Sequence, residues 1–370
     1  MRPKNKATPR TALMALLAAV AFCAFACSGW AFAQEARPIE RDIAKAFEAG
    51  KLNGLHSVLV LFQGETLAEI YFDGIDERWG TGLGVVSHGH DTLHDMRSIT
   101  KSVTGLLYGI ALSQGKVPGT GANLLAQFPE YSELKGDPLR DRITVGDVLS
   151  MRMGTEDVLA LAMEHAADRY RYVLSQQMIA APGEQWSYND GAPTLIGKLI
   201  EDGTGRALED FARDELFQPL DISLWEWNRT SDGTVSTAAG LRLTARDLAK
   251  IGQLVLEGGV FDGRQIVPKS WLDKSFTPST NPQEIPYGFF WRLADIDRQA
   301  ATAPIRSPDM KIIGPSAIIV ATGRGGQRLL VRTDLGLVVV IFAGNYHDSR
   351  DWELPARIIE EYIAPQLPRP

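Results

Sequence analysis

Short apolar runs lie near the two ends of the chain, and apolar positions recur with a helical period in its middle. Residues 56–72, HSVLVLFQGETLAEIYF, form two apolar runs around Gln63-Gly64, which predicts a β-hairpin. Near the C-terminus, β-branched runs separated by glycine-rich or Asp-Leu-Gly turns predict strands over 317–321, 327–333 and 337–343. Residues 353–362 follow them with apolar positions at helical spacing and predict a closing helix.

Three stretches in the middle of the chain have the period of helices, at 99–110, 195–200 and 248–256. Strands at both ends with helices between them indicate one sheet built from sequence-distant segments. We therefore expect an α/β (α+β) fold, with an antiparallel sheet flanked by helices and an inserted, mainly helical region. Because no linker or repeat divides the chain, we expect a single domain over 34–370. Its α/β lobe would cover about 38–97 and 275–370, and its helical lobe about 98–274.

The first 33 residues predict an export signal that is not part of the fold. Four basic residues precede a mostly apolar stretch over 11–26, and Ala31-Phe32-Ala33 supplies a small-x-small cleavage site. The apolar stretch is shorter than the roughly 20 residues that span a bilayer. We therefore expect a periplasmic or secreted protein without a membrane span. The alternative is lipoprotein processing at Cys27, which would leave a lipid anchor.

Removal of this leader changes the composition in two ways. Both cysteines, Cys23 and Cys27, lie within it, so the mature chain would have no disulfide and no cysteine–metal site. The formal charge falls from −7 to −11, because four basic residues and no acidic ones are removed. The mature part contains no basic tract, so we do not expect it to bind nucleic acid.

Residue types that bind metals crowd into residues 88–94, which contain His88, His90, Asp91 and His94. His-x-His spacings do occur in zinc sites. However, the acid directly follows the second histidine, and His56 lies far away in an unrelated context. Glycine recurs through the residues 82–89, which favours a solvated loop. We therefore expect no metal and no other cofactor.

Ser98 and Lys101 follow these histidines at the start of a long apolar helix. A serine hydroxyl needs a base beside it to act as a nucleophile, and a spacing of three keeps Lys101 on the same helix face. If burial holds that lysine neutral, it can take the Ser98 proton. Ser113 and Ser132 begin the same Ser-x-x-Lys pattern, but they lie at a helix end and among charged residues. The alternative for Ser98 is a helix N-cap, and the spacing alone leaves both interpretations open.

Two later segments carry residues suited to the same chemistry. The loop 181–191, APGEQWSYNDG, contains Tyr188, which could relay a proton to a leaving group or simply pack beside Trp186. Residues 321–327, ATGRGGQ, join two strands, and their glycines allow either close approach to a ligand or a tight turn. Each segment by itself could be structural.

Taken in this order, Ser98-x-x-Lys101, the Tyr-Asn loop and the glycine-rich C-terminal strand resemble the serine β-lactamase and penicillin-binding superfamily. They look most like its class C-type branch of serine hydrolases, which includes esterases and aminohexanoate-dimer-type amide hydrolases. Three further segments resemble that branch: ITVGDVLSMRMG, AAGLRLTARDLAKIGQLVLEGG and PYGFFW, at 143–154, 238–259 and 286–291.

The resemblance implies a β-lactamase/transpeptidase-like fold and a role for each matching residue. Ser98 would be the acylated nucleophile, Lys101 its base partner and Tyr188 the proton relay. If Gly323 aligns with the glycine of the family's third motif, the backbone N–H groups of Ser98 and Arg324 would form the oxyanion hole.

Two departures from the family pattern change the substrate that we expect. The family's Tyr-x-Asn motif here has Asn189 in the middle and Asp190 in third place, both expected to face substrate, and an ionised acid cannot donate an amide N–H. Ala321 stands where a lysine or histidine usually binds a substrate carboxylate. Arg324 would replace that cation only if its side chain turned inward.

We therefore expect an exported serine hydrolase that forms an acyl-enzyme with a small-molecule ester, amide or peptide-like substrate. An esterase or small-amide hydrolase is favoured. The alternatives are a β-lactamase, a D-alanyl-D-alanine peptidase or a non-hydrolytic penicillin-binding-type protein. The sequence does not indicate an oligomeric state.

Overall fold

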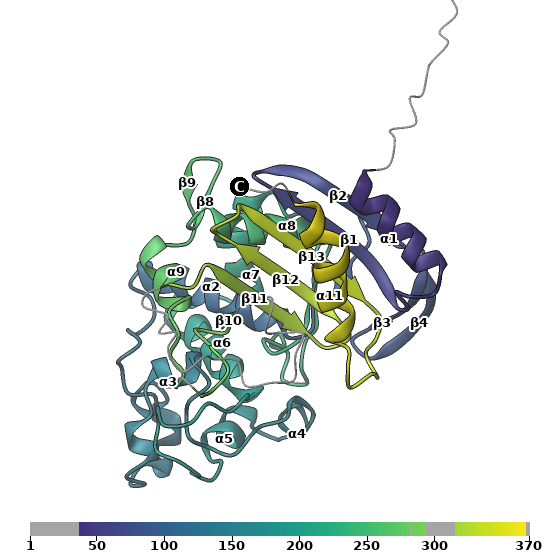
Figure 1. Ribbon diagram of the computed structural model, residues 1–370. Helices are drawn as coiled ribbons and strands as arrows, with labels where there is room; N and C mark the ends of the chain where they lie inside the picture. Colours follow the sequence, from purple (N-terminus) through teal and green to yellow (C-terminus); the bar gives the residue numbers. More distant parts are fainter. Residues whose placement is uncertain (1–36, 282, 294–314, 368–370) are drawn as a thin grey trace, which may run out of the picture. The chain divides into compact units, whose positions relative to one another are not determined.

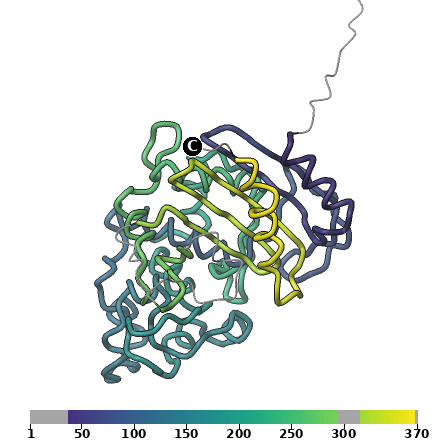
Figure 2. The backbone as a smooth tube through the Cα atoms, in the orientation of Figure 1, coloured from purple at the N-terminus to yellow at the C-terminus, as the bar shows by residue number. Residues whose placement is uncertain are grey.

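One antiparallel sheet joins the two ends of the chain. The computed structural model describes residues 37–281, 283–293 and 315–367, and in these residues the sheet has six strands in the order β10-β11-β12-β13-β1-β2. β1 (Leu55–Phe62) pairs with β13 (Leu337–Ala343), so strands far apart in sequence lie side by side (Figure 2). The predicted sheet from sequence-distant ends is confirmed.

The first hairpin forms because its turn suits the strands that it joins. Gln63 and Gly64 connect β1 to β2 (Glu65–Tyr71), and their φ angles are +51° and +85°. Two positive φ angles give a turn whose twist matches that of paired strands, and glycine adopts such angles without steric cost. The hairpin predicted over 56–72 is confirmed.

Side chains alternate across the sheet into two hydrophobic cores. On β13, Val339 faces the core that contains α1 (Pro38–Glu48) and α11, whereas Val338 faces the core shared with the helical region (Figure 1). Successive strand residues point to opposite faces, so β13 is apolar throughout. α8 (Ala245–Leu256) packs closely on the second face, because a Cβ at Gly252 would lie 2.5 Å from Val338 Cγ1.

The buried helix α2 (Ile99–Ser113) begins directly after Ser98. Its residues from Ile99 to Ala111 are all buried, as expected for a core helix that is apolar on every side. α2 contacts α6 (Gly191–Thr204) and the strand β11. The three helices predicted from periodicity, now α2, α6 and α8, are confirmed.

The C-terminal prediction is also confirmed, because three strands are followed by α11 and the π-helical turn η6. The further strands are β3 (Gly74–Arg78), β4 (Thr81–Val86), β5 (His94–Asp95), β6 (Glu226–Trp227), β7 (Leu241–Leu243), β8 (Val260–Phe261), β9 (Arg264–Gln265), β10 (Arg292–Leu293), β11 (Ile318–Gly323) and β12 (Gln327–Arg332). The further α-helices are α3 (Val145–Leu149), α4 (Ala160–Glu164), α5 (Arg169–Leu174), α7 (Leu208–Ala212), α9 (Lys269–Ser275) and α11 (Glu353–Arg357). The 3-10 and π turns are η1 (Leu125–Gln127), η2 (Pro129–Leu134), η3 (Arg140–Arg142), η4 (Arg213–Phe217), η5 (Gln218–Leu220), η6 (Ile358–Ile363) and η7 (Ala364–Gln366).

Arg37–Pro370 forms one compact unit. The predicted leader, with Cys27 and the cleavage site after Ala33, lies outside the described residues. Within the described part of the chain, no helix combines the length and apolarity that a bilayer crossing requires.

Part of the segment expected as a loop forms a second hairpin, in which β3 pairs with β4. Gly84 has a φ of +73°, and the register shifts beside it, between Asp76 and Glu77. Glycine thus marks a bulge in a paired strand. The expectation of a loop is therefore wrong over 81–86, although this strand is largely exposed.

Candidate active site

Ser98 occupies the N-cap position of α2, but its hydroxyl does not cap the helix. The side chain makes no capping hydrogen bond. Instead, Ser98 Oγ accepts a hydrogen bond from Lys101 Nζ at 2.9 Å. A capping serine would turn its oxygen towards the backbone N–H groups of the first helical turn. The geometry therefore favours a reactive hydroxyl over a cap.

The residue before Ser98 has an unusual backbone conformation. Arg97 has a φ of +48°, in the left-handed region that residues other than glycine seldom adopt. Its guanidinium pairs with Glu77 at 3.0 Å and Asp95 at 3.2 Å and lies 4.6 Å from the Tyr346 ring centroid. Outliers of this kind persist where neighbouring groups fix them, and they cluster at functional sites. These contacts hold the turn that presents Ser98.

Lys101 is buried, and all three donors of its ammonium group have partners. Its side chain is 2 % exposed. Lys101 Nζ donates to Ser98 Oγ at 2.9 Å and to the Ala238 carbonyl at 2.7 Å, and it lies 2.8 Å from Asp190 Oδ1. A protonated lysine has three donors and no acceptor, so these three oxygens match the charged form.

The surroundings of Lys101 favour its charged form over the neutral form that a base would need. Burial by itself lowers the pKa of Lys101, but Tyr188 and the Asp190 carboxylate outweigh burial and raise the pKa above its ordinary value. A carboxylate in contact favours the ammonium form. In this form Lys101 has no lone pair with which to take the Ser98 proton.

Tyr188 lies beside Lys101 on the loop before α6. Lys101 Nζ is 5.0 Å from the centroid of the Tyr188 ring. The ring also packs against Trp186, with centroids 6.3 Å apart, and Trp186 in turn contacts the Tyr287 ring at 5.4 Å. Packing beside Trp186 therefore accompanies a position next to Lys101, and the proton-relay role of Tyr188 stays a prediction.

The resemblance implies that Asn189 faces substrate, but in the structure its side chain does not line the pocket. Its side chain is buried, where Nδ2 donates to the Glu156 carbonyl at 3.3 Å and Oδ1 accepts from Gly191 N–H at 2.8 Å. Both bonds fix the loop at the start of α6. The expected substrate contact of Asn189 is therefore wrong, because the backbone already uses its amide.

Asp190 contacts Lys101 where the resemblance implies a substrate contact. One carboxylate oxygen pairs with Lys101 Nζ at 2.8 Å, and the other accepts from Ala160 N–H at 3.2 Å. The side chain is 22 % exposed and does not belong to the lining of the Ser98 pocket. Asp190 thus positions the Lys101 side chain and favours its protonated form.

At Gly323, β11 packs closely against the backbone of Met96, two residues before the nucleophile. A Cβ at this position would lie 2.3 Å from the Met96 carbonyl oxygen, nearer than any side chain tolerates. Ala321 and Thr322, directly before it, line the pocket in front of Ser98. The glycine therefore lets the strand pack against the backbone that leads into the nucleophile.

Besides Lys101, the basic residue that lines the pocket is Arg292 and not Arg324. Arg324 Nε donates to the Tyr346 carbonyl at 2.8 Å, and Arg324 does not line the pocket. The suggestion that Arg324 turns inward is therefore wrong. Arg292 on β10 lines the pocket, because it pairs with Val320 of β11. The sequence reasoning missed Arg292, although the PYGFFW segment directly before it was a usable signal.

The pocket in front of Ser98 is small, and aromatic, basic and hydroxyl side chains line it together. It is lined by Ser98, Lys101, Ser102, Tyr188, Tyr287, Phe290, Arg292, Val320, Ala321 and Thr322. Burial and the neighbouring Tyr188 hold the pKa of Tyr287 well above its ordinary value, so its hydroxyl stays protonated. Tyr287 can therefore donate a hydrogen bond within this pocket, whereas it cannot act as a base.

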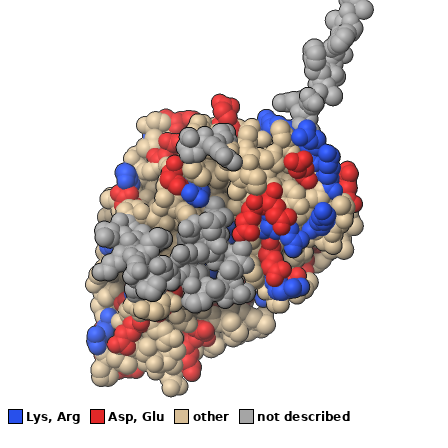
Figure 3. Space-filling view, viewed as in Figure 1, with Lys and Arg blue, Asp and Glu red and all other residues tan. Residues whose placement is uncertain are grey.

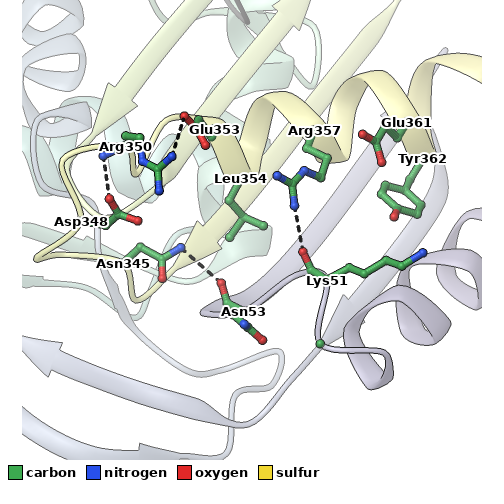
Figure 4. Close-up of a pocket in the computed structure, with 11 residues that line it drawn as sticks. Lys51, Asn53, Asn345, Asp348, Arg350, Glu353, Leu354, Arg357, Glu361 and Tyr362 are labelled. Carbon is green, nitrogen blue, oxygen red and sulfur yellow. Dashed lines mark hydrogen bonds and ion pairs between the residues drawn. The ribbon is translucent and has the colours of Figure 1, made fainter.

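A larger groove of about 650 Å³ lies between Lys51 and α11 (Figure 4). Its polar groups pair with one another: Arg350 lies 3.8 Å from Glu353, and Arg357 donates to the Lys51 carbonyl at 3.1 Å. Acidic and basic side chains are interspersed where α1 and α11 form the surface (Figure 3). No predicted site residue lines this groove, so its size does not make it the active site.

The structure also gathers histidines that the sequence keeps apart. His56, Asp76, His88 and His94 each bring one ligand atom within 4.8 Å of the others. His88 and His94 are 3 % and 1 % exposed, so the expected solvated loop is wrong for both. Burial, with smaller effects of neighbouring histidines, lowers the pKa of His56 to about 3 and that of His94 to about 4. Both rings are therefore neutral at pH 7.

The chain is similar in sequence or in fold to known hydrolases. The chain is 25 % identical to a 6-aminohexanoate-dimer hydrolase of Paenarthrobacter ureafaciens over 236 residues, which cover 58 % of this chain and 55 % of that protein. The chain thus spans about half the length of this curated relative. Two solved structures share the fold. A family VIII carboxylesterase has a TM-score of 0.64 at 15 % identity, covering 86 % of this chain and 95 % of that one.

The second solved structure is a β-lactamase/D-alanine carboxypeptidase from Pseudomonas syringae. Its TM-score is 0.65 at 15 % identity, and the match covers 87 % of this chain and 98 % of that one. Residues 49–362 match the sequence profile of the family described as Beta-lactamase. The resemblance seen in the sequence is confirmed, and the chain belongs to the Beta-lactamase family.

Proposed function

We propose that the chain is an exported serine hydrolase that cleaves an ester or small amide through an acyl-enzyme on Ser98. The observation that carries this proposal is the 2.9 Å hydrogen bond from Lys101 Nζ to Ser98 Oγ, in a pocket and not in a helix cap. Similarity to a 6-aminohexanoate-dimer hydrolase and to a carboxylesterase supports amide or ester substrates.

In the proposed reaction, Ser98 Oγ attacks the substrate carbonyl carbon while Tyr188 relays its proton. Lys101, as an ammonium, stabilises negative charge on the Ser98 and Tyr188 oxygens. Tyr188 then returns the proton to the leaving oxygen or nitrogen, and an ester on Ser98 remains. Tyr188 next deprotonates a water that attacks this ester. The acid departs, and Ser98 Oγ takes the proton back.

The carbonyl oxygen becomes negative in both steps and needs donors in place. The backbone N–H groups of Ser98 and Arg324 are the proposed donors, and each would contribute about 3 kcal/mol. Their proposed position depends on Gly323, which allows β11 to pack on the segment before Ser98.

Ser98→Ala tests the proposal, with Ser113→Ala as the matched control. Ser113 begins a second Ser-x-x-Lys pattern, but its hydroxyl donates to the Ile110 carbonyl at 2.8 Å at the end of α2. We expect turnover of a nitrophenyl ester to fall to the uncatalysed rate in Ser98→Ala and to stay at the wild-type rate in Ser113→Ala. A fluorophosphonate should label Ser98, detected by peptide mass spectrometry. Wild-type turnover by Ser98→Ala would disprove the mechanism, and labelling without turnover of any substrate would favour the non-hydrolytic alternative.

A β-lactamase or D-alanyl-D-alanine peptidase is the second candidate, because Arg292 lines the pocket. A guanidinium is well suited to bind a substrate carboxylate. The test is a panel of neutral esters, nitrocefin, D-amino amides and linear amide dimers on wild type and Arg292→Gln. If the substrate bears a carboxylate, Arg292→Gln should raise its KM by about tenfold or more and leave neutral esters unchanged.

Export is proposed from the basic and apolar pattern of the leader. The mass of the mature protein from an exporting host tests it, since cleavage after Ala33 and lipidation at Cys27 give different masses. Cys27→Ser should leave the mass unchanged in the first case. An uncleaved chain would contradict export through this leader.

A further inference from the structure

Four buried side chains converge in the region that precedes the nucleophile in the chain. His56 lies on β1, Asp76 on β3, His94 on β5, and His88 follows β4. His94 Nε2 is 2.9 Å from His56 Nδ1 and 3.6 Å from Asp76 Oδ1. His88 Nε2 is 3.4 Å from Asp76 Oδ2. The four side chains are at most 3 % exposed.

Backbone acceptors fix the proton positions of two of the histidines. His88 Nδ1 lies 2.9 Å from the Phe72 carbonyl oxygen, and His94 Nδ1 lies 3.1 Å from the Asp95 carbonyl oxygen. A carbonyl oxygen only accepts, so both Nδ1 atoms carry a hydrogen. This leaves both Nε2 atoms as the ring atoms that a metal ion would bind, and both face the Asp76 carboxylate.

His56 leaves one nitrogen unsatisfied in either neutral form. If Nδ1 carries the hydrogen and donates to His94, the lone pair of the buried Nε2 has no partner. If Nε2 carries the hydrogen, this donor has no partner and Nδ1 directs a lone pair towards His94. An unpaired buried polar atom costs about 1–3 kcal/mol. A cation among these acceptors would remove the conflict.

We propose that His56, Asp76, His88 and His94 bind a divalent transition-metal ion, for which zinc is the best fit. Imidazole and carboxylate groups are typical zinc ligands. In a tetrahedron with bonds of 2.0–2.1 Å, ligand atoms lie roughly 3.3 Å apart, and here they lie between 2.9 Å and 4.8 Å apart. The carbonyls on His88 and His94 are outer contacts of the kind that orient metal-binding imidazoles. The Tyr346 hydroxyl makes a further outer contact, because it donates a hydrogen bond to Asp76 Oδ1 at 2.8 Å.

The ion would be structural and not catalytic. Four buried protein ligands leave no coordination position for water or substrate, whereas catalytic zinc sites keep one open. The ion would tie β1 of the large sheet to the β3–β4 hairpin and to β5. Because β5 continues through Met96 and Arg97 to Ser98, the ion would stabilise the turn before the nucleophile. This inference stands independently of the proposed function.

Metal content, thermal stability and a cobalt spectrum test the site on the whole chain, purified without a histidine tag. We expect about one equivalent of zinc per chain and a Tm that chelator lowers and added zinc restores. Cobalt(II) in place of zinc should give the strong visible absorption of a four-coordinate site. His88→Gln should weaken zinc binding by about 100-fold or more. The matched control is His90→Gln, which changes an exposed histidine of the same segment and should bind like wild type.

Two results would overturn the proposal. The first is a wild-type chain that retains no metal and whose Tm responds to neither zinc nor chelator, since the histidines would then be a hydrogen-bonded part of the core. The second is an equal loss of metal in His90→Gln and His88→Gln, which would assign the ion to the surface. If His88→Gln does not fold, the wild-type cobalt spectrum decides, and its absence overturns the site.

Discussion

Two buried polar clusters each take some of their residues from the segment 88–101. They differ in how their hydrogen-bond donors and acceptors are matched. Around Lys101, three donors of one ammonium meet three oxygens. Around Asp76, three imidazoles and a carboxylate converge with more acceptors than hydrogens. The ammonium of Lys101 satisfies the first cluster, whereas the nitrogen and oxygen atoms of the second cluster match the ligand set of the proposed metal ion. Burial alone therefore says little about what a polar group does; the count of donors and acceptors around it distinguishes the two clusters.

The segment 88–101 would serve two purposes. Its first half, with His88 and His94, would fix the backbone before the nucleophile, and its second half presents the Ser98 hydroxyl. Arg97, with its positive φ, lies between the two and is held by Glu77 and Asp95. A site that must hold a reactive serine within a fraction of an ångström needs such support from the residues behind it.

The largest expected effect comes from removing the donor at the centre of the first cluster. Lys101→Met keeps the length and burial of the side chain but leaves Ser98 Oγ and the Ala238 carbonyl without their donor. We expect kcat/KM on a nitrophenyl ester to fall by about 10³-fold. The Tm should also fall, because Asp190 loses its partner. Lys101→Met combined with Asp190→Asn should recover stability and not activity, and recovery of activity would contradict the role of Lys101.

A smaller effect is expected at the edge of the second cluster. Tyr346→Phe removes the hydrogen bond to Asp76 Oδ1 but keeps the ring beneath the Arg97 guanidinium. Zinc affinity, measured by competition with a chromogenic chelator, should fall by about 10–100-fold, with little change in kcat/KM at saturating zinc. Unchanged affinity would remove Tyr346 from the surroundings of the metal.

The smallest effect tests the charge of Lys101. The Asp190 carboxylate helps to raise the pKa of Lys101 against the effect of burial. Asp190→Asn removes that charge, so the pKa of Lys101 falls and the ammonium is lost at a lower pH. If the ammonium is the active form, the alkaline limb of the kcat/KM profile should move to lower pH by about one unit. Higher activity of the variant at neutral pH would instead favour a neutral Lys101 as the base.

Much of the fold was predictable because its patterns are local. The apolar, β-branched run of β13 and the apolar face of α8 involve residues only a few positions apart. Ser98 and Lys101 could be paired from the sequence for the same reason, since they are neighbours on one helix. Arg292 could not, because only the pairing of β10 with β11 brings it to the pocket. The predicted substrate contact of Asn189 was wrong because its amide is hydrogen-bonded to the Glu156 carbonyl and to Gly191 N–H, and these partners come from the folded backbone.

The sequence by itself determined the strands, the helices, the order of the family motifs and the identity of the candidate nucleophile. The tertiary structure alone decided the charge of Lys101 and the grouping of His56 with His88 and His94, which come from different strands of the chain. The physical reason is that periodicity follows from the local geometry of the backbone. The protonation and ligand-binding capacity of a buried group depend instead on every dipole and charge that folding brings around it.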